Sequence, residues 1–373
     1  MASINSMSAT VDSVAVFFEH GFADIRRQSA WDFSGRQIYL GDHSVSVIYL
    51  ALDPTKYVLD QAIAGGCELI VTHHPLFLSP AKGLSVNNSR DAFIIQAIKN
   101  NISVLSYHTN LDMSPGGLNS YLLQLLSAKD GGILESEGEI PYIKLIVFTP
   151  VSHEKAVLDA IDKIGGGQIG NYRRCAFTVE GTGTFTPIDG ANPFTGSIGK
   201  EEYVKEARQE ILVPAANIQK AVDALKKAHP YETPAFDIVP VKSPEPYGFI
   251  RIGIAERKYP FEEFISLLKV KFKTSYVRSN MKTFPDGARV FAVCCGSGAS
   301  LWKVCLKHGI KVFVTGDVKH HDALDAKEAG VCIIDIGHYH SERVYMTYLA
   351  GLLEDNFNVK TFVAEEDPPI LLL

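Results

Sequence analysis

The sequence predicts a mostly parallel α/β protein made of two similar halves that together form one metal-binding domain, interrupted by a ferredoxin-like α+β insert. Predicted strands and helices alternate in the first third of the chain and again in the last third, which is typical of parallel sheets. The middle third orders its elements as ferredoxin-like folds do. Histidines and carboxylates follow several of the predicted strands. The boundaries we expect are residues 1–141, 142–241 and 242–373.

Length and composition place the chain among soluble globular proteins. Its 373 residues exceed one ordinary domain, and 46% hydrophobic with 21% charged residues is ample for a sizeable core. The net charge of -6 argues against a simple electrostatic nucleic-acid binder, although a local basic patch stays open. No apolar run reaches the length of a membrane span, and no secretory signal is visible. The six cysteines form no CxxC pair, so we expect reduced core residues and a cytoplasmic protein.

The first half reads as alternating strands and helices. Val58, Leu59 and Ile63 follow helical spacing, and Gly65-Gly66 ends that helix before the central strand. The expected elements are an amphipathic helix over residues 10–30, a strand over Val45–Leu52, a helix over Pro54–Ala64, a strand over Leu69–Thr72, a helix over Asp91–Lys99, a strand over Ile102–Tyr107 and a helix from Ser114 to Leu126.

The last third repeats this order. The expected strands cover Arg289–Cys295, Ile310–Val314 and Val331–Ile336, with helices after each, the last reaching Leu353. From Ala51 to Thr72 is 72 − 51 = 21 positions, and from Cys294 to Thr315 is 315 − 294 = 21 positions. Both spans read strand, turn, helix, glycine, strand, so we expect an internal duplication whose two copies superpose.

The insert has its own pattern of elements. We expect strands at Lys144–Phe148, Ala176–Val179, Glu210–Val213 and Phe236–Val239, helices over His153–Ile164 and Ala216–Ala228, and a long loop around Gly181-Thr182-Gly183-Thr184. That glycine-rich stretch could bind an anion, but a flexible hairpin is the default interpretation. The string His229-Pro230-Tyr231-Glu232 favours a structural loop over a binding site.

Polar residues gather just after the predicted strands. Because ligands of open parallel sheets bind outside the carboxyl ends of the strands, these side chains can meet in one cleft. His338 and Glu342 are four residues apart and face the same way on a helix. The set is His73 and His74, His108 and Asp112, Asp317 with His320 and His321, and His338 with Glu342.

Imidazoles and carboxylates without cysteine suit Zn, Fe, Mn or Co rather than a thiolate site. Two-metal hydrolytic sites hold their ions about 3.5–4 Å apart, often with a bridging carboxylate, and produce hydroxide from water near neutral pH. The alternative is a set of polar strand ends that cap helices, and we favour the metal site. The Cys295-Gly296-Ser297-Gly298 turn could bind a phosphate, but it lacks a Walker lysine, so a packing turn is favoured.

The chain resembles the Nif-three-like family, whose bacterial members are often labelled type 2 GTP cyclohydrolase I homologues. The resemblance covers nearly the whole chain. Its insert is similar to that of the longer bacterial members, which resembles PII and CutA signalling proteins. The strings that carry it are Thr72-His73-His74-Pro75, Tyr107-His108-Thr109-Asn110-Leu111-Asp112, Thr315-Gly316-Asp317 with His321-Asp322, Gly337-His338-Tyr339-His340-Ser341-Glu342, Gly181-Thr182-Gly183-Thr184-Phe185, Gly190-Ala191-Asn192-Pro193-Phe194 and His229-Pro230-Tyr231-Glu232.

The resemblance implies two divalent metal ions per chain, of Zn, Fe or Mn. By position the ligands are His73, His74, Asp112, His338 and Glu342, with Glu342 a candidate bridge. His108 and His321 match other polar positions of that cleft, as supporting or acid/base groups. The resemblance also implies a homo-hexameric ring that encloses a cavity, with the inserts near its openings. The family's Trp-Asp-Asn-x-Gly-Leu pattern appears here as Trp31-Asp32-Phe33-Ser34-Gly35-Arg36, which leaves the rim near Trp31 in question.

Three functions remain open from the sequence. The first is a metal-dependent hydrolase acting on a nucleotide, a phosphoester or a C–N bond, with GTP ring opening as one option from the family label. The second is a regulatory or metal-handling assembly whose insert binds a small-molecule effector. The third is a nucleic-acid-binding ring, which the acidic net charge disfavours.

Overall fold

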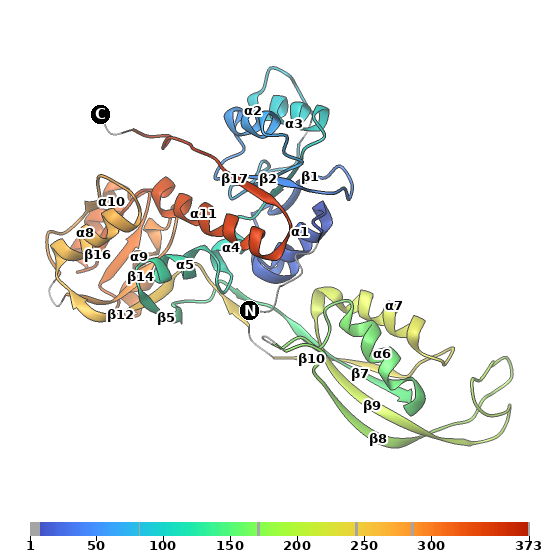
Figure 1. Cartoon of the computed structure of the whole chain (residues 1–373). Helices are drawn as coiled ribbons and strands as arrows, with labels where there is room; N and C mark the ends of the chain where they lie inside the picture. Colours follow the sequence, from blue (N-terminus) through green and yellow to red (C-terminus); the bar gives the residue numbers. More distant parts are fainter. Residues whose placement is uncertain (1–7, 82, 170–171, 243–244, 285–286, 372–373) are drawn as a thin grey trace. The chain divides into compact units, whose positions relative to one another are not determined.

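The structure is a computed structural model that describes residues 8–81, 83–169, 172–242, 245–284 and 287–371. It divides into two compact units, Met1–Gly138 with Tyr247–Leu373, and Glu139–Pro246. The first unit is built on a five-stranded and a six-stranded sheet and the second on a four-stranded sheet (Figure 1), and β6 (Gly138–Glu139) and β11 (Pro246–Tyr247) form a further two-stranded sheet. The predicted insert, residues 142–241, lies within the second unit.

The sheet of the N-terminal half is parallel except at one edge. The strand order is β1 (Gly35–Ile38), β4 (Ser103–Ser106), β3 (Leu69–Thr72), β2 (Val47–Ala51) and β17 (Lys360–Val363), with only β1 antiparallel. The central strands β3 and β4 are buried along their whole length and β2 is buried after Val47, which explains their largely apolar sequences. Helices α2 (Lys56–Ala64) and α3 (Ser89–Lys99) pack on the same face of this sheet.

The sheet of the C-terminal half has the same parallel centre. Helices α9 (Trp302–Lys307) and α10 (His320–Glu328) pack on one face. The other face joins the main core together with α8 (Phe261–Lys271), α5 (Leu118–Leu125) and α11 (His338–Asn356). The strand order is β13 (Arg278–Ser279), β16 (Cys332–Asp335), β15 (Val312–Thr315), β14 (Ala288–Val293), β12 (Arg251–Tyr259) and β5 (Ala128–Ile133).

The two halves share a register as well as a strand order. In the N-terminal half Ala51 is paired with Thr72, and in the C-terminal half Val293 is paired with Val314. Both pairs are 21 positions apart (72 − 51 and 314 − 293). An antiparallel edge strand, β1 or β13, completes the similarity. The chain therefore forms two similar α/β halves within one compact unit.

The halves also exchange a strand. After α5 the chain continues into β5, which pairs with β12 of the other half, and after α11 it continues into β17, which pairs with β2 (Figure 1). A single core containing Leu50, Phe264 and Tyr345 packs against both sheets. Neither residues 1–141 nor 242–373 therefore contain the whole of one sheet.

Two predictions about the N-terminal half are wrong in detail. The helix expected over residues 10–30 is α1 (Val11–Phe17), a π-helical turn (Phe18–Phe22) and a separate 3-10 turn (Ile25–Arg27). The Asp24 side chain accepts a hydrogen bond from the backbone N–H of Arg26, which competes with a continuing helix. The second difference is α4 (Thr109–Met113), a short and wholly buried helix between the strand and the helix predicted there, where no element was expected.

The second unit has the ferredoxin-like order of elements. Four antiparallel strands lie in the order β10-β7-β9-β8, and α6 and α7 cover one face (Figure 1). The Gly181–Thr184 stretch is part of strand β8, so the prediction of a flexible loop there is wrong. The bounds are β7 (Tyr142–Pro150), α6 (Glu154–Asp162), β8 (Ala176–Phe185), β9 (Glu202–Pro214), α7 (Ile218–Ala228) and β10 (Phe236–Val241).

The cysteines are as the sequence predicts, and the length and apolar character of each helix decide whether it could cross a membrane. All six cysteines are free thiols, and five of them are buried. Within the part of the chain that the structure describes, no helix has both the length and the apolar character needed to cross a membrane.

Candidate metal centre

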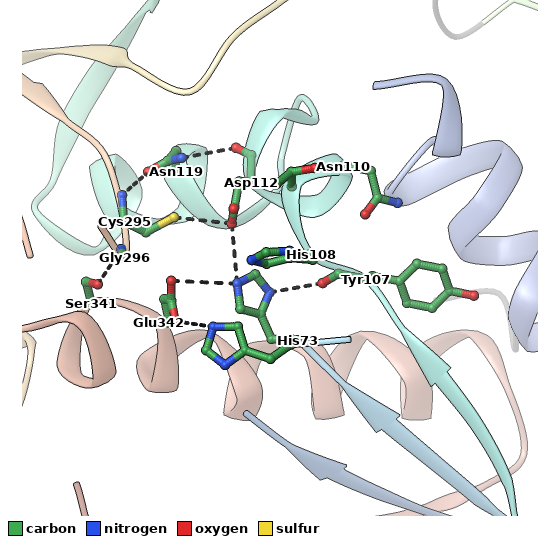
Figure 2. Close-up of polar contacts among 12 residues, drawn as sticks. His73, Tyr107, His108, Asn110, Asp112, Asn119, Cys295, Gly296, Ser341 and Glu342 are labelled. Carbon is green, nitrogen blue, oxygen red and sulfur yellow. Dashed lines mark hydrogen bonds and ion pairs between the residues drawn. The ribbon is translucent and has the colours of Figure 1, made fainter. Parts of the chain in front are cut away.

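The polar side chains that were predicted to follow the strands lie close together, and they come from both sheets of the first unit. His73 and His74 follow β3, and His108 precedes α4, which carries Asp112. His338 begins α11 after β16, and Glu342 lies one turn further along the helix. Figure 2 shows His73, His108, Asp112 and Glu342 converging on a common space. The carboxyl ends of the strands therefore form a site, as the topology predicts.

Four imidazoles are oriented in the same manner. In each one, Nδ1 is hydrogen-bonded to an oxygen: Tyr107 O at 2.9 Å for His73, Asp53 Oδ1 at 2.8 Å for His74, Asp32 Oδ1 at 3.1 Å for His108 and Asp317 Oδ2 at 2.7 Å for His338. This contact orients each ring so that Nε2 faces the site. Metal-ligating histidines characteristically have such a partner.

Glu342 lies at the middle of this arrangement. Its Oε1 is 3.7 Å from His73 Nε2, and its Oε2 is 3.2 Å from His74 Nε2 and 3.1 Å from His338 Nε2. The carboxylate is only 3% exposed. Its two oxygens therefore face different histidines, which is the arrangement expected of a bridging ligand.

Asp112 completes the base of the site. Its Oδ1 lies 3.7 Å from His73 Nε2 and accepts a hydrogen bond of 3.2 Å from the Cys295 thiol. Burial raises the pKa of Cys295 well above its ordinary value, so the sulfur is a protonated donor and not a thiolate ligand. Burial also raises the pKa of Asp112, with a further contribution from the nearby Glu342 charge.

Charge in the site is concentrated on Glu342 and the two outer imidazoles. Burial disfavours the Glu342 carboxylate, yet the surrounding histidines hold its pKa well below the ordinary value. Burial likewise disfavours the imidazolium forms, but hydrogen bonds to Asp53 and Glu342 raise the pKa of His74 to about 10. Contacts with Glu342 and Asp317 raise the pKa of His338 to about 9. The site therefore stabilises positive charge beside a buried carboxylate.

The residues present fit a metal ion. His73 Nε2 is buried and has no hydrogen-bond partner, and the Asp112 and Glu342 carboxylates lie 3.7 Å from it. Leaving a buried polar atom unpaired costs about 1–3 kcal/mol, which coordination of a cation would remove. Two groups have their ligand atoms within 4.8 Å of one another, namely His73, His74 and His108, and His74, His338 and Glu342. Nitrogen and carboxylate donors of this kind suit Zn, Fe or Mn.

Gly296 keeps the space beside Glu342 open. Its φ is +60°, and a Cβ on it would lie 2.4 Å from Glu342 Oε1 and 3.4 Å from His338 Nε2. The turn that carries Gly296 is therefore a packing turn against the site, as the sequence favours. Its backbone N–H donates to Ser341 Oγ at 2.9 Å, which joins this turn to α11.

Gly296→Ala is expected to weaken metal binding at least tenfold and to lower the free energy of unfolding by about 1–3 kcal/mol. The added methyl must displace the Glu342 carboxylate. The control is Gly309→Ala, because Gly309 also has a positive φ, +72°, but nothing within 4 Å of its Cβ position. Calorimetric titration with Zn²⁺ and urea unfolding measure the two effects. Equal metal affinities for both variants would show that the methyl does not reach the site.

Asp53→Asn is expected to reduce metal affinity about tenfold, since the variant loses the charge that orients His74. Competition titration with a chromogenic chelator measures this change. The control is Asp60→Asn, which removes an exposed carboxylate paired with Lys56 on α2. An affinity equal to that of wild type would mean that Asp53 does not support the centre.

The centre opens onto a cleft of about 440 Å³. His74 and His338 lie in its wall, whereas His73 is 1% exposed behind them. Other lining residues are Tyr276, Arg278, Asp317, His340 and Pro368–Ile370 near the end of the chain. A small molecule in this cleft would reach the two outer imidazoles.

The structure separates the seven site residues that the family resemblance implies. His73, His74, His108, Asp112, His338 and Glu342 lie together. His321 does not join them: it is exposed on α10, and its ring packs against His320 with centroids 5.3 Å apart. Following a strand is not sufficient to place a side chain in the site: residues 316–319 separate the end of β15 from the start of α10.

Sequence reasoning missed two of the residues that orient the histidines. Asp53 follows β2 with only Leu52 between them, so the rule that selected His73 would also have found it. Asp32 has no such signal, because it lies in an irregular segment and reaches His108 and Thr109 only through the tertiary fold. Asp32 belongs to the Trp31–Arg36 segment, in which the chain departs from the pattern of the family it resembles. Its side chain is buried, with only 4% of the residue exposed.

Fold and site define a two-half α/β protein with an inserted ferredoxin-like unit and a candidate histidine–carboxylate metal centre. The profile of the family Duf34/NIF3 (NGG1p interacting factor 3) matches residues 9–369, and the chain belongs to this family.

Relatives from several bacteria support this assignment. A Staphylococcus aureus (strain MSSA476) protein named "GTP cyclohydrolase 1 type 2 homolog" is 36% identical over 337 residues, covering 89% of each chain. A protein of that name from Bacillus subtilis (strain 168) is 33% identical over 342 residues, covering 90% of this chain and 91% of the relative. The solved structure of a Bacillus cereus protein related to NIF3 has a TM-score of 0.83 and 31% identity, and covers 99% of this chain and 100% of that one.

Proposed function

We propose that the protein is a dinuclear metal-dependent hydrolase. The observation that carries this proposal is Glu342, whose two oxygens face different histidines at 3.1–3.7 Å. Glu342 is the one carboxylate in these two groups, and its two oxygens allow it to join two neighbouring ions. The residues that would hold the ions are His73, His74, Asp112, His338 and Glu342.

Bound divalent ions would supply Lewis acidity and a nucleophile from water at neutral pH. The chain's own residues provide orientation and access. Asp53 and Asp317 hold the imidazoles of His74 and His338 toward the cleft. Tyr107 O holds the imidazole of His73, and the buried Cys295 thiol holds the Asp112 carboxylate. A substrate enters through the cleft beside His74 and His338.

We assign a proton-transfer role to His108. Asp32 accepts a hydrogen bond from its Nδ1, so Nε2 is directed and free, as in a base oriented by a third group. His108→Ala discriminates this role from metal ligation. Retention of both ions with loss of turnover supports proton transfer, whereas loss of an ion would make His108 a ligand.

The test of the hydrolase is metal content followed by a substrate screen. The protein, purified without chelator and reconstituted with Zn, Mn or Fe, is analysed for ions per chain and assayed with nucleotides including GTP, phosphoesters and amides. The names of the relatives make GTP ring opening one arm of this screen. Turnover that is absent from Glu342→Gln supports the proposal. Two bound ions without turnover of any substrate would favour a metal-handling role instead.

We also propose that the chain assembles as a homo-hexamer, as its family resemblance implies. Light scattering on the eluted peak tests this, and a mass of six chains is the expected result. A monomer at micromolar concentration would contradict it.

A further inference from the structure

The second unit contains a cavity of its own, of about 460 Å³. It lies where the end of strand β8 and the segment that follows it meet residues 231–235 after α7. Its volume is in the range of about 300–1,000 Å³ that small-molecule sites occupy. The side chains that characterise it are Phe148, Phe185, Phe194, Tyr231, Glu206 and Glu232.

The walls of the cavity are aromatic. The ring centroid of Tyr231 lies 6.0 Å from that of Phe185 and 6.2 Å from that of Phe194. His229 fixes Tyr231, because its Nδ1 accepts the backbone N–H of Tyr231 at 3.1 Å and its Nε2 donates to Phe148 O at 3.0 Å. Aromatic faces carry partial negative charge, so several rings around one space attract a cation.

A buried carboxylate reaches the same space. Glu206 is 9% exposed, and its Oε1 accepts a hydrogen bond of 2.9 Å from the Tyr231 hydroxyl. Gly183 makes room for it, because a Cβ there would lie 2.1 Å from Glu206 Oε2. This is the physical reason for glycine in the Gly181-Thr182-Gly183-Thr184 stretch. A carboxylate in this position argues against the anion site that the sequence left open.

A second carboxylate lies at the rim. Glu232 Oε1 accepts the backbone N–H of Asn192 at 3.0 Å, which ties the 186–201 segment to the cavity. Among the residues that the structure describes, neither Glu206 nor Glu232 has a cationic side chain within 4.0 Å. The nearest arginine on this wall, Arg208, lies over the Phe148 ring and pairs with Glu210. Within the described part of this unit, no cationic side chain therefore pairs with the Glu206 carboxylate.

We propose that this cavity binds a small organic cation, an ammonium group carried on an apolar body. Glu206 supplies the opposite charge, and Tyr231, Phe185 and Phe194 supply the aromatic faces. An aromatic enclosure that contains carboxylates without a cationic partner is the chemistry that recognises substituted ammonium groups. No curated name among the relatives assigns a ligand to this unit.

The experiment uses the full chain and three probes with the same body but different charge. Benzyltrimethylammonium, benzyl alcohol and benzoate are each titrated and followed by ligand-observed NMR. We expect the cation to bind at least tenfold more tightly than the neutral probe, and benzoate to bind most weakly. Equal or tighter binding of either other probe, or no binding of the cation, would overturn the proposal.

Three variants locate the site. Glu206→Gln keeps the shape and removes the charge, and we expect at least tenfold weaker binding of the cation. Phe194→Ala removes one wall, and because Phe194 is 53% exposed the fold should tolerate the change. Glu180→Gln, an exposed carboxylate on β8, is the matched control and should bind as wild type does. Unchanged affinity in both Glu206→Gln and Phe194→Ala would contradict the assignment, and thermal melts confirm that each variant is folded.

Discussion

Glu342→Gln is expected to abolish stoichiometric metal binding, with an affinity at least a hundredfold below that of wild type. Three imidazole nitrogens, on His73, His74 and His338, face this one carboxylate within 3.7 Å. Removing a group that orients a metal ligand lowers metal affinity about 10–100-fold. We expect the loss of a ligand shared by two ions to lower the affinity further. The amide keeps the volume of the side chain, so the loss reflects charge and donor strength rather than a cavity.

Elemental analysis and Zn²⁺ titration measure this effect. The control is Asp355→Asn, which removes an exposed carboxylate from the same helix without contacting the site. Circular dichroism must show that Glu342→Gln remains folded, since the imidazoles lose their partner. Full metal content in the folded variant would remove Glu342 from the centre and with it the case for a bridging ligand.

Metal affinity is expected to rise steeply with pH, about a hundredfold per unit between pH 6 and 8. The pKa of His74 is raised to about 10 and that of His338 to about 9, so both imidazoles carry a proton through this range. An ion that binds their Nε2 atoms must displace both protons. The slope of log affinity against pH is therefore about 2.

Calorimetry in buffers of different ionisation enthalpy counts the protons released. In His338→Gln one of the two protons is absent, and the slope should fall to about 1. An affinity independent of pH in the wild-type protein would mean that the two imidazoles are neutral before the metal binds.

The metal-free protein should respond to pH in the opposite sense. A histidine whose pKa is raised by folding contributes stability that is fully present below its unfolded value, about 6.5. That contribution is lost as the pH rises through about 9 for His338 and about 10 for His74. The free energy of unfolding without metal should thus decrease between pH 7 and 10, while stabilisation by added metal increases. Urea unfolding at several pH values, with and without Zn²⁺, shows both trends.

Local sequence was sufficient for most of the fold. The aliphatic segments that become β2, β3, β4, β15 and β16 were predicted within one or two residues, because strands buried on both faces have few alternatives. The ferredoxin-like order of the insert follows from its alternating elements. The helix over residues 10–30 was wrong because the competing hydrogen bond of Asp24 is invisible to hydrophobic spacing.

The candidate site was likewise predicted in part from local sequence and in part not. His73, His74, His338 and Glu342 were found because each follows a strand or begins a helix, and in open α/β folds these places line the ligand cleft. Asp32 was not identified as a partner of His108, because it lies 76 residues away in the chain. His321 shares the sequence pattern but lies on the exposed surface of α10.

The chain by itself therefore determined the element types, the insert and which polar side chains follow the strands, since these depend on local periodicity and on residue chemistry. Only the tertiary structure decided the exchange of β5 and β17 between the halves, because pairing of distant strands leaves no local signal. It also decided which oxygens orient each imidazole and that Glu342 lies between three of them. Such contacts depend on distances between residues far apart in the sequence, which follow from how α11 and β3 pack in the folded unit.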